Sequence, residues 1–281
     1  MRNDVEIIIA GDARGVSTAA ADIVTDLVRA KPNAVLGLAT GSSPLGLYAE
    51  LAARVVDGLD MTAVRGFALD EYVGLAPDDP RSYAHTIRTT VTEPLRLDAA
   101  NVHVPSGVAT DLEAACDGFE SEMVRAGGVD VQILGIGRNG HLGFNEPGSA
   151  FESRTRITTL AEQTRRDNAR YFAQPQDVPT RCSTQGLATI MKARTAVLIA
   201  TGTAKAHAVD RALRGPVTVD CPASILQRHP SVVVVLDEDA AHSMSRDCLQ
   251  WPATTSDSST TTGSLAPGRN EYATHTRPKN R

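Results

Sequence analysis

The densest group of residue types suited to proton transfer lies in a glycine-rich segment, residues 135–148, which reads GIGRNGHLGFNEPG. Its His141 titrates near neutral pH and can accept or donate a proton. Its Glu146 can orient an imidazole and raise the basicity of the ring. Four glycines between residues 135 and 143 indicate an unusual backbone path. The segment therefore predicts an acid–base site, although a structural turn carrying a solvated histidine would use the same residue types.

A second candidate site begins where an apolar run ends at Leu69. Two acids, Asp70 and Glu71, follow directly, and burying carboxylates at such a place costs free energy unless they have a use. Asp70 is therefore a candidate general base. Two acids at an exposed strand end would explain the same pattern, so the residues alone leave both interpretations open.

A third polar segment, residues 38–44, reads LATGSSP and lies between an apolar run and a helical pattern. Gly41 lets the backbone approach a ligand closely, and Thr40 and Ser42 carry hydroxyl groups. The helix that follows presents free N–H groups and the positive end of its dipole to an anion. These features predict a phosphate cradle. An ordinary N-capped turn is the alternative, and the Gly-Lys-Ser/Thr ending of a P-loop is missing.

These segments need a scaffold that brings them together, and the apolar runs predict one. Short runs rich in β-branched residues, near residues 5–10, 34–39, 67–69, 129–136, 196–200 and 231–236, alternate with amphipathic helical stretches. Runs that are apolar on both faces are typical of parallel strands covered by helices. We therefore predict an α/β fold with a mainly parallel, doubly wound, Rossmann-like sheet and helices on both faces. Ligands of such folds bind beyond the carboxyl ends of the strands, where all three polar segments stand.

Local signals also place boundaries along the chain. Ser17 is the predicted N-cap of the first helix, Pro32 ends that helix, and Pro44 suits the first turn of the next one. Residues 1–251 are expected to form a single α/β catalytic domain. Residues 252–281 are dominated by Thr, Ser, Gly, Pro and Asn with almost no apolar periodicity, which predicts a disordered C-terminal tail.

The composition narrows the class of protein. A net charge of -5 and a pI near 5.8 argue against a nucleic-acid partner. No stretch approaches the roughly 20 apolar residues of a membrane span, so no membrane partner is expected. The cysteines are scattered without zinc-ligand spacing, which favours reduced structural thiols, no metal site and a cytoplasmic protein. They are Cys116, Cys182, Cys221 and Cys248.

The three polar segments, in their order along the chain, resemble the glucosamine-6-phosphate deaminase family, within a wider group that includes the 6-phosphogluconolactonases. The segments that carry the resemblance run from about residue 35 to residue 236 and read LATGSSPLGLY, ALDEYVGL, GIGRNGHLGFNEPGS, SRTRITTL, TGTAKA and ILQRHP. The resemblance implies an enzyme without metal or cofactor. It would isomerise and deaminate D-glucosamine 6-phosphate, giving D-fructose 6-phosphate and ammonia in amino-sugar catabolism.

The resemblance also implies a role for each matching residue. Asp70 would remove the proton from sugar carbon 2 and return it at carbon 1. His141 would assist opening of the pyranose ring, with Glu146 paired to it. Asn139 stands where some members of the family have Asp, which weakens a carboxylate relay at that position. The phosphate of the small-molecule substrate would be held by Thr40, Gly41, Ser42, Arg170 and Lys205.

A regulatory site implied by the same resemblance is altered in this chain. Some members are activated by N-acetylglucosamine 6-phosphate, which binds at positions that correspond to Ser149, Arg156, Thr158 and Thr159. Thr158 stands where the regulated enzymes have Lys, and the loss of that cation predicts weak or absent activation. The sequence leaves the oligomeric state open, including a homo-oligomer.

Two other functions fit parts of the pattern. A lactonase acting on a phosphorylated sugar lactone would use His141 to activate water and would not need Asp70. A non-catalytic sugar-phosphate sensor would carry a helix-turn-helix segment and a basic face, and neither is visible in the sequence. The presence of Asp70, His141 and Glu146 together favours the deaminase.

Overall fold

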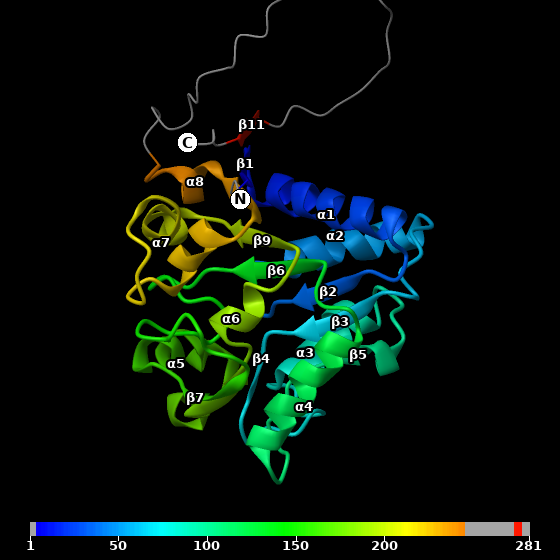
Figure 1. Ribbon diagram of the computed structural model, residues 1–281, viewed down its shortest axis with the longest axis vertical. Coiled ribbons are helices and arrows are strands. Elements are labelled where there is room, and N and C mark those ends of the chain that lie inside the picture. The colour runs from blue at the N-terminus through cyan, green and yellow to red at the C-terminus, as the bar shows by residue number, and fades with distance from the viewer. Residues whose placement is uncertain (1–3, 245–272, 277–281) are drawn as a thin grey trace, which may run out of the picture.

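The computed structural model describes residues 4–244 and 273–276. Within these residues the centre of the molecule is an eight-stranded sheet with the order β11-β1-β10-β9-β6-β2-β3-β5 (Figure 1). Every neighbouring pair in it is parallel except β1 and β11, which confirms the predicted mainly parallel sheet. The strands are β1 (Asp4–Ala10), β2 (Val35–Leu38), β3 (Arg65–Ala68), β5 (Val102–His103), β6 (Val131–Gly135), β9 (Thr195–Ala200), β10 (Ser231–Asp237) and β11 (Ala273–Thr276).

Helices cover the sheet in the doubly wound manner. The chain passes from β1 through α1 to β2 and through α2 to β3 in one direction, and from β9 through α7 to β10 in the other. Right-handed crossovers therefore place α7 on the face opposite α1 and α2, which lie side by side (Figure 1). The helices are α1 (Ala13–Ala30), α2 (Leu45–Val56), α3 (Tyr83–Ile87), α4 (Leu112–Arg125), α5 (Glu162–Asn168), α6 (Leu187–Ile190), α7 (Thr203–Arg214) and α8 (Glu238–Ala241).

The start of the first helix differs from the sequence prediction. Asp12, not Ser17, is the N-cap, and its Oδ1 accepts a hydrogen bond from the backbone N–H of Gly15 at 2.8 Å. Ser17 lies inside the helix and donates its hydroxyl to the carbonyl of Ala13. An aspartate five residues upstream offers the same cap and lengthens the helix by a turn, so the prediction was wrong. The predicted end is confirmed, because α1 stops at Ala30, before Pro32.

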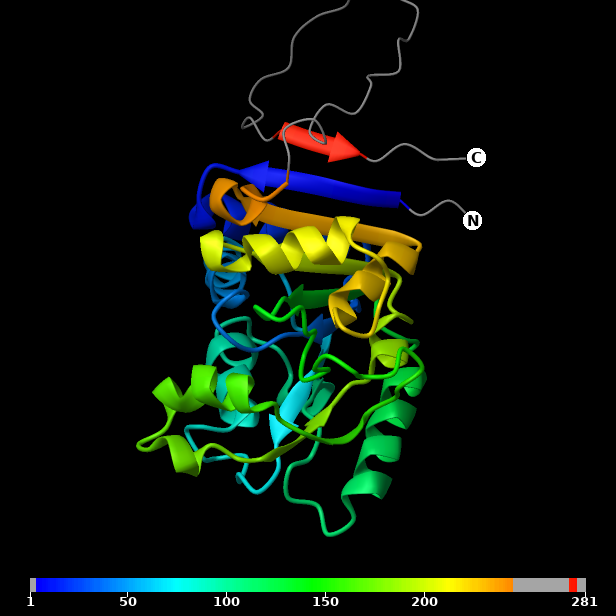
Figure 2. The same cartoon turned by 90° about the vertical axis from the view of Figure 1, so that its left-hand side faces the viewer.

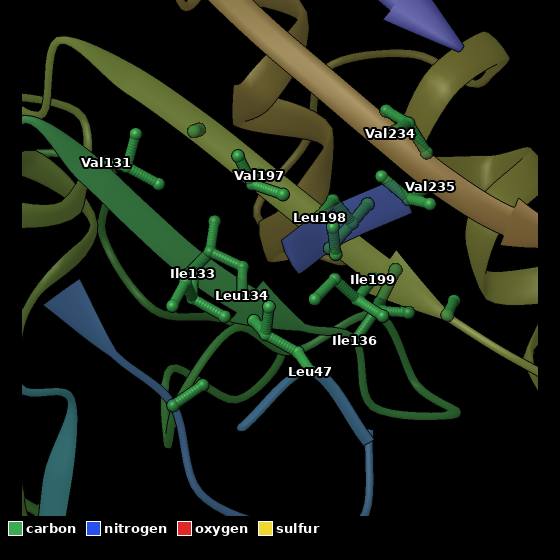
Figure 3. Close-up of a cluster of buried hydrophobic side chains, with 14 of the residues drawn as sticks. Leu47, Val131, Ile133, Leu134, Ile136, Val197, Leu198, Ile199, Val234 and Val235 are labelled. Atoms are coloured by element: carbon green, nitrogen blue, oxygen red, sulfur yellow. The ribbon is translucent and has the colours of Figure 1, made fainter. Parts of the chain in front are cut away.

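A dry layer of aliphatic side chains fixes the sheet. Figure 3 shows the side chains of β6, β9 and β10 packed against one another and against the start of α2. Burial of each such Val, Leu or Ile contributes about 1.5–3 kcal/mol to the free energy of folding. The fully buried residues of this layer include Leu47, Ile133, Leu134, Val197, Leu198, Val234 and Val235. The sheet therefore holds the loops at its carboxyl edge in fixed relative positions.

A second, smaller sheet was not predicted from the sequence. It is antiparallel, with the order β4-β8-β7, and comprises β4 (Asp70–Tyr72), β8 (Arg181–Thr184) and β7 (Arg156–Thr159). Its strands are only three or four residues long and polar, so no apolar run marks them. One residue, Leu69, separates β3 from β4, which carries the chain from the large sheet directly into the small one.

Most of the predicted disordered tail, residues 252–281, lies outside the described residues. The part that is described, residues 273–276, forms β11, which runs antiparallel to β1 along the edge of the large sheet (Figure 2). Among the described residues, none of the helices has the length and apolar character needed to cross a membrane.

Candidate active site

Loops that follow four adjacent strands, β9, β6, β2 and β3, meet at the carboxyl edge of the large sheet. They enclose a cavity of about 490 Å³, which lies within the range of roughly 300–1,000 Å³ common for small-molecule sites. Seven of the residues predicted from the sequence line it: Thr40, Gly41, Ser42, Asp70, His141, Arg170 and Lys205. The other two, Asn139 and Glu146, contact His141. The Oδ1 atom of Asn139 accepts a hydrogen bond from the backbone N–H of His141, and Oε2 of Glu146 lies 3.4 Å from Nδ1 of its ring.

Asp70 is a buried carboxylate with few partners. Side chains alternate along a strand, so β4 turns Asp70 and Tyr72 toward the cavity and Glu71 away from it. Only 3% of Asp70 is exposed, and its Oδ1 accepts a long hydrogen bond, 3.3 Å, from the hydroxyl of Thr40. Burial, and next the charge of Glu71, raise the pKa of Asp70 to about 8. A group with this pKa can exchange a proton near neutral pH.

Glu71 is held in a different way and serves the fold. Its carboxylate accepts three backbone hydrogen bonds, from the N–H groups of Tyr72, Tyr83 and Ala84, at 2.7–2.9 Å. These bonds attach the start of α3 to β4. The sequence analysis named Asp70 of the two adjacent acids as the candidate base, and the structure separates them: Asp70 faces the cavity and Glu71 anchors a helix.

The glycine-rich segment brings His141 into the lining of the cavity. A Cβ atom at position 137 would lie 2.3 Å from Cε1 of His141, so only Gly137 leaves room for the ring. A Cβ atom at position 143 would lie 3.2 Å from Oδ2 of Asp70, where Gly143 adopts φ +55°. Two glycines thus let the segment pack directly against both reactive side chains, which explains the glycine content that the sequence displayed.

Glu146 lies behind His141 and is surrounded by donors. Its Oε2 is 3.4 Å from Nδ1 of His141 and accepts a 2.8 Å hydrogen bond from the amide of Asn139, while Oε1 accepts from the hydroxyl of Thr164 at 2.5 Å. Burial acts to raise the pKa of Glu146, but the interactions with His141, followed by those with Thr164 and Asn139, outweigh it and lower the pKa. Glu146 is therefore an ionised partner for the imidazole.

The predicted phosphate cradle begins at Gly41, whose φ of +86° is a left-handed conformation that favours glycine. The loop leads into α2, and Pro44 at its N-cap makes no side-chain hydrogen bond to the helix. Helix α2 has 12 residues, and its first N–H groups receive no hydrogen bond from the side chain of Pro44. They can therefore donate hydrogen bonds to a bound anion. Thr40 was predicted to bind the phosphate. In the structure its hydroxyl donates a hydrogen bond to Asp70.

Three cations gather beside this cradle. Lys205, in the first turn of α7, donates to the carbonyl of Ile136 at 2.7 Å, and Arg170 reaches the cavity from the turn η3 (Ala169–Tyr171). Burial, then the charge of Arg138, and to a smaller degree that of Arg170, lower the pKa of Lys205. Bringing positive charges this close costs free energy that a bound anion would recover. Arg138 was not predicted, although it stands inside the glycine-rich segment.

The remaining wall is aromatic and comes from residues that the sequence analysis passed over. Tyr83 stacks on Phe144 with ring centroids 5.7 Å apart, and Phe172 meets the edge of Tyr72. Asn168 donates to the hydroxyl of Tyr72 at 2.9 Å. Residues 164 and 168 both line the cavity from α5, a helix that was not predicted from the sequence.

The residues implied for regulation lie away from the cavity lining. The guanidinium of Arg156, on β7, donates to Asn145 at 2.8 Å and to Ser149 at 3.3 Å. Thr158 lies two residues further along the same strand, where its register partner on β8 is Cys182. The structure thus gives Arg156 protein partners, and the expected weak activation stays a prediction.

A doubly wound α/β sheet with an imidazole, two carboxylates and a cationic cradle around one cavity defines the class of proteins that carry out acid–base chemistry on anionic small molecules. The sequence model of the family described as glucosamine-6-phosphate isomerases/6-phosphogluconolactonase matches residues 12–235. The match spans most of the chain and all the site residues named above. The chain belongs to this family.

Individual relatives agree. The chain is 55% identical over 240 residues to a protein of Pseudarthrobacter chlorophenolicus named glucosamine-6-phosphate deaminase, a match that covers 85% of this chain and 93% of the relative. A Cutibacterium acnes protein of the same name is 53% identical over 249 residues, with 88% and 95% coverage.

Solved structures give the same result. One described as a monomeric glucosamine-6-phosphate deaminase superposes with a TM-score of 0.82 at 40% identity, over 84% of this chain and 99% of that one. The 6-phosphogluconolactonase of Trypanosoma brucei superposes with a TM-score of 0.69 at 22% identity, over 85% and 98%, and is similar in fold.

Proposed function

We propose that this chain converts D-glucosamine 6-phosphate and water to D-fructose 6-phosphate and ammonia in amino-sugar catabolism. The observation that carries the proposal is the cavity itself, where the buried carboxylate of Asp70 and the imidazole of His141 open onto the space beside a cationic cradle. The relatives that share half or more of their residues with the chain bear the name of this enzyme. We further propose that residues 1–251 act as one catalytic domain.

The first step is opening of the pyranose ring, because only the open chain has a carbonyl group. Nδ1 of His141 faces the ionised Glu146, so this nitrogen carries a proton and the other ring nitrogen, Nε2, is the acceptor. Nε2 can take the proton of the carbon 1 hydroxyl and return it to the ring oxygen. Glu146 stabilises the imidazolium that forms between these two transfers.

The second step moves a proton between carbons. Asp70, once ionised, removes the proton from carbon 2, while a proton of the substrate's ammonium group passes to the carbon 1 oxygen. The neutral enolamine that results is protonated by the same carboxyl at carbon 1. The product carries an iminium at carbon 2 and a hydroxyl at carbon 1. Water adds to the iminium carbon, and the carbon–nitrogen bond breaks to release ammonia and leave the ketone. Entry of the substrate's ammonium group beside Asp70 favours the ionised carboxylate that the step requires.

The phosphate is remote from the reacting carbons and fixes their position. We propose that Gly41, Ser42, Arg170 and Lys205 hold it, with Arg138 as a further cation and Thr40 shared between the cradle and Asp70. Binding energy gathered there orients carbon 2 toward Asp70 without weakening the chemical step. Because a phosphorylated sugar is charged and does not cross membranes unaided, we place the reaction in the cytoplasm.

A coupled assay tests this function. The purified chain is supplied with glucosamine 6-phosphate while ammonia and fructose 6-phosphate are followed in parallel. Equal amounts of both products are expected. Hydrolysis of a phosphorylated gluconolactone with no release of ammonia from the amino sugar would contradict the proposal and support the lactonase.

Regulation and assembly are tested separately. We expect N-acetylglucosamine 6-phosphate to leave the apparent KM within about twofold, because Thr158 supplies no cation and Arg156 already has protein partners. Initial rates measured over a titration of the acetylated sugar check this, and a large fall in KM would contradict it. The oligomeric state, a homo-oligomer included, is read from light scattering on the active preparation; a similar solved structure is described as monomeric.

A further inference from the structure

Glu146, the partner of His141, has one contact that comes from helix α5 and not from the loops that follow the strands of the large sheet. The hydroxyl of Thr164, on α5, donates to Oε1 of Glu146 at 2.5 Å. Thr164 is 5% exposed, and it lines the cavity although it lies 18 residues beyond Glu146 in the chain. The other carboxylate oxygen, Oε2, already serves Asn139 and His141.

We propose that Thr164 is a positioning residue, which holds the Glu146 carboxylate ionised and turned toward His141, and thereby supports ring opening. This inference rests on the proposed function. Thr164 does not itself face the reacting carbons in this role; it acts through Glu146.

The geometry explains why the hydroxyl matters. Glu146 is 9% exposed, so a carboxylate oxygen without a donor there would be a buried charge without compensation, which is unfavourable. Removing the donor from Oε1 would let the carboxylate rotate to share Asn139 between its oxygens. Nδ1 of His141 has no hydrogen-bond partner in the described part of the chain and lies 3.4 Å from Oε2, a separation that a small rotation would lengthen further.

The location of Thr164 connects this contact to substrate binding. Helix α5 runs directly into the turn that carries Arg170, six residues further on. Asn168 lies between Thr164 and Arg170 in the chain and donates a hydrogen bond to the hydroxyl of Tyr72, which lines the cavity. A phosphate held by Arg170 would therefore steady the same short segment that presents Thr164 to Glu146.

The ionisable groups that face Glu146 are His141, on the glycine-rich segment, and the thiol of Cys182, on β8; Asn139 and Thr164 are neutral donors. Loss of one donor to a carboxylate weakens the ionised form, so the pKa of Glu146 rises when Thr164 is replaced. The acid limb of kcat/KM reports Asp70, whose pKa of about 8 lies above that of Glu146, so the shift is read from the titration of the Glu146 carboxyl carbon by NMR.

The test compares Thr164→Val, which keeps the shape and removes the hydroxyl, with Thr164→Ser, which restores the hydroxyl. Deamination of glucosamine 6-phosphate is measured at about pH 8, and the Glu146 carboxyl carbon is followed by NMR from about pH 3 to about pH 9. For Thr164→Val we expect kcat to fall about tenfold, KM to stay within about threefold, and the Glu146 titration to move up by about half a pH unit or more. Thr164→Ser should recover kcat to within about threefold and return the Glu146 titration to its original place.

Gln163→Ala provides a matched control on the same helix, because Gln163 is exposed and its amide donates to Asp167. It should behave as the unaltered chain. If Thr164→Val does not fold, as judged from a thermal melt, Thr164→Cys replaces it and should give an intermediate loss. An unshifted Glu146 titration for the folded variant, or equal damage in Thr164→Ser, would overturn the inference. An unaltered chain that releases no ammonia would instead overturn the proposed function.

Discussion

Two carboxylates of the candidate site, Asp70 in the cavity lining and Glu146 behind His141, have pKa values shifted in opposite directions. Asp70 is 3% exposed, accepts one long hydrogen bond and lies near Glu71, and burial followed by the charge of Glu71 raises its pKa to about 8. Glu146 is 9% exposed, and its interactions with His141, followed by those with Thr164 and Asn139, outweigh burial and lower its pKa. The partners around each carboxylate, together with the deeper burial of Asp70, therefore decide the direction.

The difference supports the roles that we propose for the two residues. A group that must take up and return a proton needs a pKa near the working pH, which Asp70 has. A group that must stay charged beside an imidazole needs donors that hold it ionised, which Glu146 has in Asn139 and Thr164. Exchange of the two environments would exchange the roles, and each prediction below alters one of them.

The largest effect is expected for Asp70→Asn. The amide keeps the shape of the carboxyl but cannot accept the carbon 2 proton, so kcat should fall about 10³- to 10⁴-fold. Binding of the sugar phosphate should change by less than about threefold, since Asp70 is not part of the cradle. Stopped assays for ammonia and calorimetric titration of fructose 6-phosphate measure the two quantities. Residual kcat within about tenfold of the original would remove Asp70 from the role of base.

The same substitution should stabilise the fold at alkaline pH. The pKa of Asp70 is raised from about 3.9 in the unfolded chain to about 8 in the folded one, so its contribution to stability is fully present below about pH 4 and is lost as the pH rises through about 8. Asn does not titrate. Relative to the unaltered chain, Asp70→Asn should gain on the order of 2–5 kcal/mol in the free energy of unfolding between about pH 5 and about pH 9. Urea melts at both pH values check this, and a constant difference would contradict it.

The smallest effect is expected for Asn139→Asp, which removes a donor from Glu146 and adds a second carboxylate 2.8 Å from it. Two carboxyl groups at this distance share a proton, so the titration of the Glu146 carboxyl carbon, followed by NMR, should move up by about one pH unit. Activity above about pH 8 should change by less than about threefold. A Glu146 titration that superposes on that of the unaltered chain would show that Asn139 does not set the charge of Glu146.

Much of this site could be predicted from the sequence because its residues follow buried strands. An apolar run marks each strand, parallel strands place their carboxyl ends at one edge, and the polar residues after β2, β3 and β6 must then meet. Asp70, His141 and the cradle at Gly41 were found in this way. Their specific roles came from a resemblance to a known family, and they stay predictions until the variants are measured.

Other parts could not be predicted, for physical reasons that differ. Thr164 and Asn168 lie on α5, a seven-residue polar helix whose position depends on contacts with Glu146 and Tyr72 rather than on its own apolar face. The small sheet is similar, because its strands are fixed by pairing with one another and not by a buried run. Even the separation of Asp70 from Glu71 required knowing that β4 is a strand, since alternation along it sends the two side chains to opposite sides.

The opposed ionisation of the two carboxylates can be observed directly. Aspartate and glutamate carboxyl carbons are isotope-labelled and followed by NMR from about pH 3 to about pH 10, with Asp70→Asn and Glu146→Gln spectra to assign the two signals. We predict that the Asp70 signal titrates near pH 8 and that the Glu146 signal titrates below the ordinary glutamate value of about 4.3. An Asp70 signal that titrates below about pH 5 would contradict the account, because the proposed base would then have no reason to release a proton to the substrate near neutral pH.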